Sequence, residues 1–112
     1  MEVIFFRAAS GSEPVRDWIK SLSTEKKLII GEDIKFVQLS WPVGKPTVGS
    51  LGNGLWEVRS RFDDSIARVI FHFDDKKIIL LHGFIKKTQK TPKQELDLAR
   101  KRKSIYELEN KS

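Results

Sequence analysis

The chain has 112 residues, 39% of them hydrophobic, and a formal net charge of +6. This length suits a single domain over residues 1–112, and the absence of cysteine excludes disulfides, thiol catalysis and cysteine-based metal sites. No apolar run reaches the length of a membrane span, so we expect a cytoplasmic protein without a membrane partner.

The first half of the chain predicts one strand and two helices. The apolar run in Glu2–Phe6 predicts a short strand that ends at a Ser-Gly turn. Ser12 is a suitable N-cap for a first helix, with Pro14 in its first turn. Thr24 is placed to cap a second helix with a broad apolar stripe, which Trp41-Pro42 ends. Residues 42–54, rich in Gly and Pro, predict an irregular connection.

The second half predicts three strands and a last helix. Alternating or continuous apolar residues indicate strands over Leu55–Phe62, Ile66–Phe73 and Lys77–Lys86, separated by Asp-rich turns. Thr91-Pro92 opens the last helix, with Thr91 as its cap. The order β-α-α-β-β-β-α predicts an α+β fold: a mostly antiparallel sheet of about four strands, two N-terminal helices packed on one face, and a C-terminal helix.

Polar side chains of the three later strands fall on one face of the predicted sheet. Residues two apart in a strand share a face, so Arg59 and Arg61 lie opposite the apolar set that contains Trp56 and Val58. If the strands align, the shared face carries a cationic surface with one aromatic plane, formed by Arg59, Arg61, Arg68, His72, His82, Phe84 and Lys86. Cations beside an aromatic plane are typical of single-stranded RNA recognition.

Other interpretations of these residues stay open. Arg59 and Arg61 are also compatible with an ordinary solvent-facing row, in which Glu57 pairs with one of them. His82 follows two leucines and suits a partly buried, hydrogen-bonded histidine better than a catalyst. With two histidines and no ligand spacing, neither a metal site nor a cofactor is expected.

The excess charge is confined to residues 84–103. This segment contains eight Lys and Arg residues and only two acidic residues, Glu95 and Asp97, so its own charge is +6. A local cationic excess favours a polyanionic partner such as RNA, DNA or an acidic protein, although a solvated helix with clustered lysines is the simpler alternative.

Three blocks of sequence carry a family resemblance: Leu55–Arg59, Arg68–Phe71 and Leu80–Pro92. The last is the most specific, because Phe-x-Lys-Lys-Thr is followed by a Thr-Pro helix start with Glu95 and Ala99 at set distances. The sequence resembles the HigB-type, phage-derived host-inhibition toxins of the RelE/ParE superfamily over nearly the whole chain. The resemblance implies a RelE/ParE-like fold and a type II toxin that cleaves messenger RNA on the ribosome, silenced by a helix-turn-helix antitoxin in a hetero-oligomer.

The resemblance also suggests which residues act. The matched motif positions give Arg59, Arg68, Lys86 and Lys87 as catalytic candidates. Metal-free RNA cleavage needs cations around the phosphate and groups that move protons, so arginines hold the phosphate and a lysine transfers protons in this hypothesis. We expect Tyr106 to have a packing role and not to act as an acid or base. The remaining candidates for nucleic-acid binding are Arg61, His82, Phe84, Lys90, Lys93, Arg100, Lys101, Arg102 and Lys103.

Two rival functions fit the same fold. A ParE-like inhibitor of DNA gyrase needs no RNA-cleaving residues, and a non-catalytic nucleic-acid-binding module needs only charge and stacking. The Arg- and Lys-rich face and the Phe-x-Lys-Lys block favour the metal-independent ribonuclease, but a fold by itself does not choose among functions.

Overall fold

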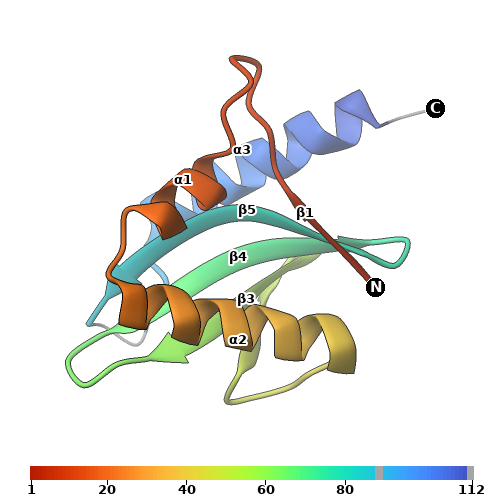
Figure 1. Cartoon of the computed structure of the whole chain (residues 1–112). Coiled ribbons are helices and arrows are strands. Elements are labelled where there is room, and N and C mark those ends of the chain that lie inside the picture. Colours follow the sequence, from red (N-terminus) through yellow and green to blue (C-terminus); the bar gives the residue numbers. More distant parts are fainter. Residues whose placement is uncertain (88–89, 111–112) are drawn as a thin grey trace.

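The computed structural model describes residues 1–87 and 90–110. Within them a five-stranded sheet separates two helical layers (Figure 1). The elements, in chain order, are β1 (Glu2–Phe5), α1 (Pro14–Lys20), α2 (Thr24–Ser40), β2 (Val48–Gly52), β3 (Leu55–Arg61), β4 (Ile66–Asp74), β5 (Lys77–Lys86) and α3 (Lys93–Glu109).

The sheet is mixed, with the strand order β1-β5-β4-β3-β2. β1 runs parallel to β5, and every other neighbouring pair is antiparallel. The α+β class is therefore confirmed, whereas the prediction of about four strands is wrong, because β2 lies in the segment expected to be irregular. Asn53 and Gly54 have φ values of 53° and 78° and turn the chain from β2 into β3. An Asn-Gly pair is a strong hairpin signal.

The two helical layers cover opposite faces of the sheet. α1 and α2 pack on one face, where Val15, Ile30 and Val37 join Val69 and Phe71 in a buried cluster. α3 lies across the other face over β4 and β5, where Ala99 and Tyr106 join a second buried cluster (Figure 1). We predicted that this second face is open to solvent. That prediction is wrong, because α3 covers part of the face.

The helix starts differ by one residue from the predicted caps. Ser23 caps α2 by accepting a hydrogen bond from the Lys26 amide, in place of Thr24. Glu13, whose side chain makes no capping hydrogen bond, precedes α1 where Ser12 was expected. Pro92 precedes α3, so the Thr91 hydroxyl is left to bond elsewhere.

A β-bulge interrupts the alternation of β5. Ile70 pairs with His82 and Phe71 pairs with Leu80, so Leu81 is an extra residue between them. Leu81 joins the cluster beneath α3, and His82 bonds to α3 as well. Two consecutive side chains therefore point to the same face at this position.

Candidate functional site

The strand register brings the predicted cationic residues onto one face, the face that α3 partly covers. Arg59 and Phe84 both pair with Arg68 and form one row across β3, β4 and β5. Arg61 and Lys86 both pair with Ile66 in the next row, toward the end of the sheet. The alignment expected from the alternation is thus confirmed for the three strands.

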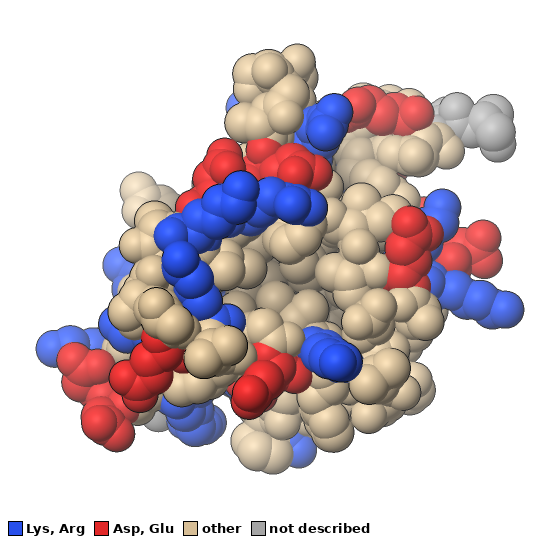
Figure 2. Space-filling view, in the orientation of Figure 1, with Lys and Arg blue, Asp and Glu red and all other residues tan. Residues whose placement is uncertain are grey.

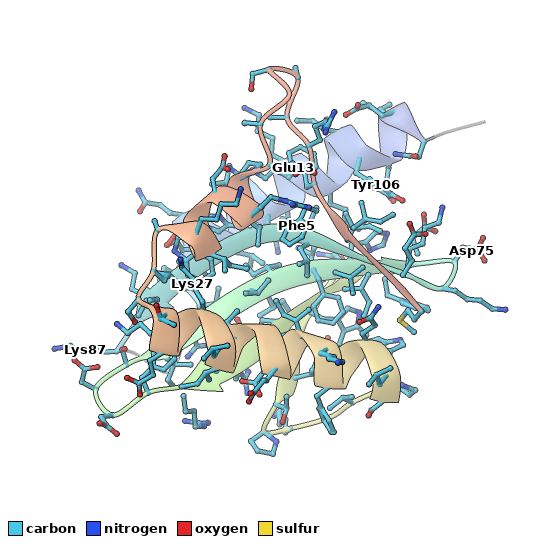
Figure 3. All side chains as sticks on the ribbon, in the orientation of Figure 1. Phe5, Glu13, Lys27, Asp75, Lys87 and Tyr106 are labelled. Atoms are coloured by element: carbon cyan, nitrogen blue, oxygen red, sulfur yellow. The ribbon has the colours of Figure 1, made fainter. Side chains whose placement is uncertain are left out.

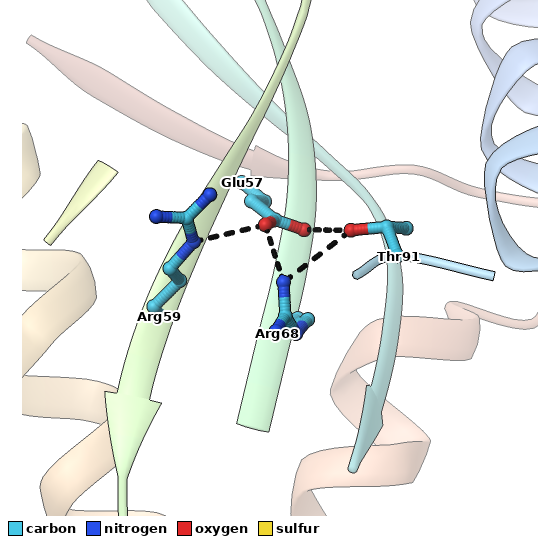
Figure 4. A network of polar contacts seen from close by, with 4 residues as sticks. All are labelled: Glu57, Arg59, Arg68 and Thr91. Carbon is cyan, nitrogen blue, oxygen red and sulfur yellow. Dashed lines mark hydrogen bonds and ion pairs between the residues drawn. The ribbon is translucent and has the colours of Figure 1, made fainter. Parts of the chain in front are cut away.

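Glu57 is the centre of a buried polar network on this face (Figure 4). Its Oε1 accepts hydrogen bonds from Arg68 Nη1 at 2.7 Å and from Arg59 Nε at 2.9 Å. Its Oε2 accepts from the Thr91 hydroxyl at 2.6 Å. The carboxylate therefore ties β3 and β4 to the segment that leads into α3. The expected pairing of Glu57 with Arg59 is confirmed, but it belongs to a buried network with Arg68 and not to a solvent-facing row.

Arg68 and Phe84 do not lie on a solvent-facing patch, which corrects the expected surface. The Arg68 side chain is only 1% exposed, and Phe84 is 6% exposed. A buried guanidinium needs a counter-charge, and Glu57 supplies it. Phe84 stacks on His82 with ring centroids 5.6 Å apart, so its ring contacts protein atoms instead of offering a free plane.

Arg59 is partly exposed to solvent, with 21% of its side chain accessible. It lines a shallow pocket of about 400 Å³ together with Ser50 and Leu51 of β2 and with Lys90, Thr91 and Leu96. The network and the pocket share Glu57, Arg59 and Thr91.

His82 and Arg102, both expected to bind nucleic acid, instead contact each other and other groups of the chain. His82 Nε2 bonds to Glu95 Oε1 at 2.8 Å. Arg102 Nη1 donates to the Leu81 carbonyl at 2.8 Å and lies 3.2 Å from His82 Nδ1. Burial lowers the pKa of Arg102. Their placement follows from α3 lying over β5, so both residues attach the helix to the sheet.

Most of the remaining predicted cations are exposed, and two of them form ion pairs along α3. Arg100 pairs with Asp97 at 3.4 Å and Lys103 pairs with Glu107 at 3.3 Å, each along α3. The exposed residues are Arg61, Lys86, Lys87, Lys90, Lys93, Arg100 and Lys101. Figure 3 shows Lys87 at the end of the sheet opposite to Asp75. Thr88, which completes the Phe-x-Lys-Lys-Thr motif, and Gln89 lie outside the described residues.

The face covered by α1 and α2 carries charges of both signs. Figure 2 shows basic and acidic side chains interspersed over this face, which is the usual pattern of a solvated surface. Lys86, Lys87, Lys90 and Lys93 follow one another from the end of β5 into the start of α3.

Tyr106 packs against the sheet, as expected, at the opposite end from Lys87 (Figure 3). Its pKa is raised first by burial and then by the carboxylates of Asp74 and Glu2.

His72 hydrogen-bonds the Gly54 carbonyl through Nδ1 at 2.8 Å. Among residues 1–87 and 90–110 no three His, Asp or Glu side chains gather as they do around a bound metal ion. No helix in the same residues has the length and apolar character needed to cross a membrane.

Sequence reasoning did not identify Glu57 as the shared anchor of this network or Thr91 as a donor to it. Glu57 carried a usable signal, because a carboxylate within a row of arginines on a strand is a ready counter-ion. Thr91 lies 34 residues from Glu57 in the chain, and only the fold brings the two together.

A family model described as "Phage derived protein Gp49-like (DUF891)" matches residues 17–104 of the chain. The match spans α2, all of β2 to β5 and most of α3, and so includes the Glu57 network. No curated protein matches the sequence.

Proposed function

The chain belongs to the Gp49-like family of phage-derived proteins, and from this premise we propose that it is the toxin of a type II toxin–antitoxin system. In this proposal the toxin is a metal-independent endoribonuclease that cleaves messenger RNA on the ribosome and so arrests growth. A helix-turn-helix antitoxin binds it and silences it. The family match supports a phage-derived protein, and the HigB-like Phe-x-Lys-Lys block supports the ribonuclease.

The observation that carries this proposal is the set of cations on the second face of the sheet. Arg59, Arg61 and Lys86 share that face by strand register, and Lys87 and Lys90 follow directly along the chain. All except Arg59 are exposed, and Arg59 lines a pocket. Exposed cations on one face of a sheet attract a phosphate backbone and position it.

Cleavage of RNA without a metal uses the 2′-hydroxyl as nucleophile on the neighbouring phosphate and leaves a 2′,3′-cyclic phosphate. The guanidinium of Arg59 stabilises the charge that develops on the phosphate oxygens. Lys86, the last residue of β5, transfers a proton at the 2′-oxygen or at the departing 5′-oxygen. Arg68 serves as the buried partner that holds Glu57, and through it Arg59.

Induction of the protein in bacteria, followed by primer extension on matched translated and untranslated messages, tests the proposal. We expect cuts only in the translated message. Arg59→Ala should lower the rate by on the order of 10²–10³, by analogy with the loss of one oxyanion-stabilising donor. Lys35→Ala is the matched control, because Lys35 is an exposed cation on α2, which covers the opposite face.

Two outcomes would contradict the proposal. Intact messages together with a DNA-damage response would point to gyrase inhibition on the same fold. Intact messages with RNA binding alone would point to a non-catalytic binding module. Equal cutting by the Arg59→Ala variant would remove Arg59 from the mechanism.

A further inference from the structure

Helix α2 is apolar on both of its sides. Ile30 and Val37 are buried against the sheet. Leu28, Phe36 and Leu39 are 60%, 50% and 73% exposed and lie on the outer side of the helix. A helix that is apolar all round is usually buried, and exposed apolar side chains that lie together mark a contact with another molecule. The outer side of α2 is therefore a candidate interface.

The exposed residues of α2 form one row along the helix. Leu28 and Leu39 are separated by about three helical turns, so they lie on the same line of the helix surface. Glu32 and Lys35 lie between them on the same side, and both are exposed. Figure 2, drawn from this side of the molecule, shows uncharged surface between separate charged groups. We call Leu28, Glu32, Lys35 and Leu39 the α2 stripe.

The two charges of the α2 stripe have opposite signs and are not neutralised inside the chain. Within residues 1–87 and 90–110, neither Glu32 nor Lys35 takes part in an ion pair or a side-chain hydrogen bond. Unpaired charges beside an apolar row favour a partner that carries the complementary charges at the matching positions.

A second copy of the chain carries those charges when two α2 helices pack antiparallel. If the two-fold axis passes midway between Glu32 and Lys35, then Glu32 lies level with Lys35 of the second copy. Leu28 then lies level with Leu39 of the second copy. A two-fold interface needs this reciprocity, because every contact between two different residues occurs twice. The sequence order Leu-Glu-Lys-Leu therefore matches its own reverse in apolar character and in charge.

We propose that α2 is the interface of a weak homodimer in which the α2 stripes of two copies pack antiparallel. The leucines supply most of the association, because exposed ion pairs contribute little, and the Glu32–Lys35 pairs fix the direction. The sheet separates α2 from α3, so the face beneath α3 stays uncovered by this contact in both copies (Figure 1). The dimer goes beyond the proposed ribonuclease activity and does not depend on it.

Sedimentation velocity over a series of protein concentrations tests the dimer. We expect the wild type to pass from monomer to dimer as its concentration rises. Leu39→Ala removes an apolar contact twice in each dimer and should weaken association by on the order of tenfold to a hundredfold. Leu108→Ala is the matched control, because Leu108 is also 73% exposed but lies on α3. The control should associate as the wild type does.

Charge exchange tests whether the partner is a second copy. Glu32→Lys places two lysines level with each other across the interface and should weaken association several-fold, since like charges repel. Adding Lys35→Glu to the same chain restores opposite charges at both levels and should recover the dimer. A different protein on this surface would not be restored by the exchange.

Cross-linking tests the antiparallel register. The chain has no cysteine, so a thiol can be placed at a chosen level of the helix. A mixture of Leu28→Cys and Leu39→Cys should form a mixed disulfide on oxidation, which intact mass identifies. Either variant alone should cross-link far less, because its two thiols would lie about 16 Å apart along the helix axis.

Several results would overturn the homodimer. A monomer at every concentration would do so, as would equal effects of Leu39→Ala and Leu108→Ala. Self-cross-linking of Leu28→Cys at the yield of the mixture would exclude the antiparallel register. A chain that stays monomeric, but binds a helix-turn-helix protein only with Leu39 intact, would assign the α2 stripe to an antitoxin instead.

Discussion

Replacing Arg68 with alanine should test the burial of the Glu57 network most directly. The Arg68 and Glu57 side chains are each 1% exposed, and Nη1 of Arg68 lies 2.7 Å from the carboxylate. Removing one partner of a buried ion pair costs about 3–5 kcal/mol, because the other charge stays buried with fewer partners. The bonds from Arg59 and Thr91 to Glu57 remain, so we expect a loss near the lower end, about 3 kcal/mol.

This loss translates into a large thermal shift. The unfolding entropy is about 2.1 cal/mol/K per residue, or roughly 0.24 kcal/mol/K for a chain of this size, so each kcal/mol lowers Tm by about 4 °C. Arg68→Ala should therefore lower Tm by roughly 12 °C. Circular dichroism and urea titration measure the midpoint and the free energy of unfolding.

The matched control for this prediction is the uncharged pair Glu57→Gln with Arg68→Met. It removes both buried charges together, so it should cost less than the sum of the two single changes. A loss below about 1 kcal/mol for Arg68→Ala would place the pair among exposed salt bridges and refute the reasoning. So would a variant that keeps full stability and loses only cleavage, because Arg68 would then contact the RNA directly.

Three further outcomes follow from other parts of the molecule. The raised pKa of Tyr106 means that the folded state keeps its phenol proton to higher pH than the unfolded chain, whose pKa is about 10. Stability should therefore fall as the pH rises above about 10, and Tyr106→Phe should flatten that alkaline decline in a denaturation series; an unchanged slope would contradict the assignment. Gly83→Ala should destabilise by about 1–3 kcal/mol, because its Cβ would overlap the Trp18 ring, whereas Gly31→Ala, with open space around it in α2, should stabilise by about 0.5–1 kcal/mol. If α3 docks on ribosomal RNA, Lys101→Ala should make the slope of log affinity against log salt shallower by about 0.9, and a parallel line would remove Lys101 from the interface.

The alternation of side chains was enough to predict which strand residues share a face. The spacing of two residues assigned faces within each strand, and the placement of Arg59, Arg68 and Phe84 on one side depended on the strands aligning, which the register confirms. Alternation is a local property of extended backbone, so it can be found in sequence without knowledge of the fold. The same property gave the three consecutive strands.

What covers that face was not predictable from the same signals. Arg68 and Arg61 are the same residue type on the same face of the sheet. In the structure α3 and Thr91 cover Arg68, whereas Arg61 stays exposed. The choice depends on where α3 crosses the sheet, which rests on contacts far apart in sequence, such as Arg102 with His82. β2 was missed for another reason, because its Gly-rich segment lacks an apolar pattern and only the Asn53-Gly54 turn signals a hairpin.

The extra residue in β5 changes which side chains point toward α3 in the rest of the strand. Before Leu81 the odd-numbered residues of the strand point toward α3, and after it the even-numbered ones do. Lys86 points to the α3 face because of this one-residue offset. If Leu81 were deleted, Lys86 would point to the opposite face and Lys87 would take its place on the α3 face. Two adjacent lysines at the strand's exit would therefore keep one ammonium on the cationic face whichever phase the strand adopts.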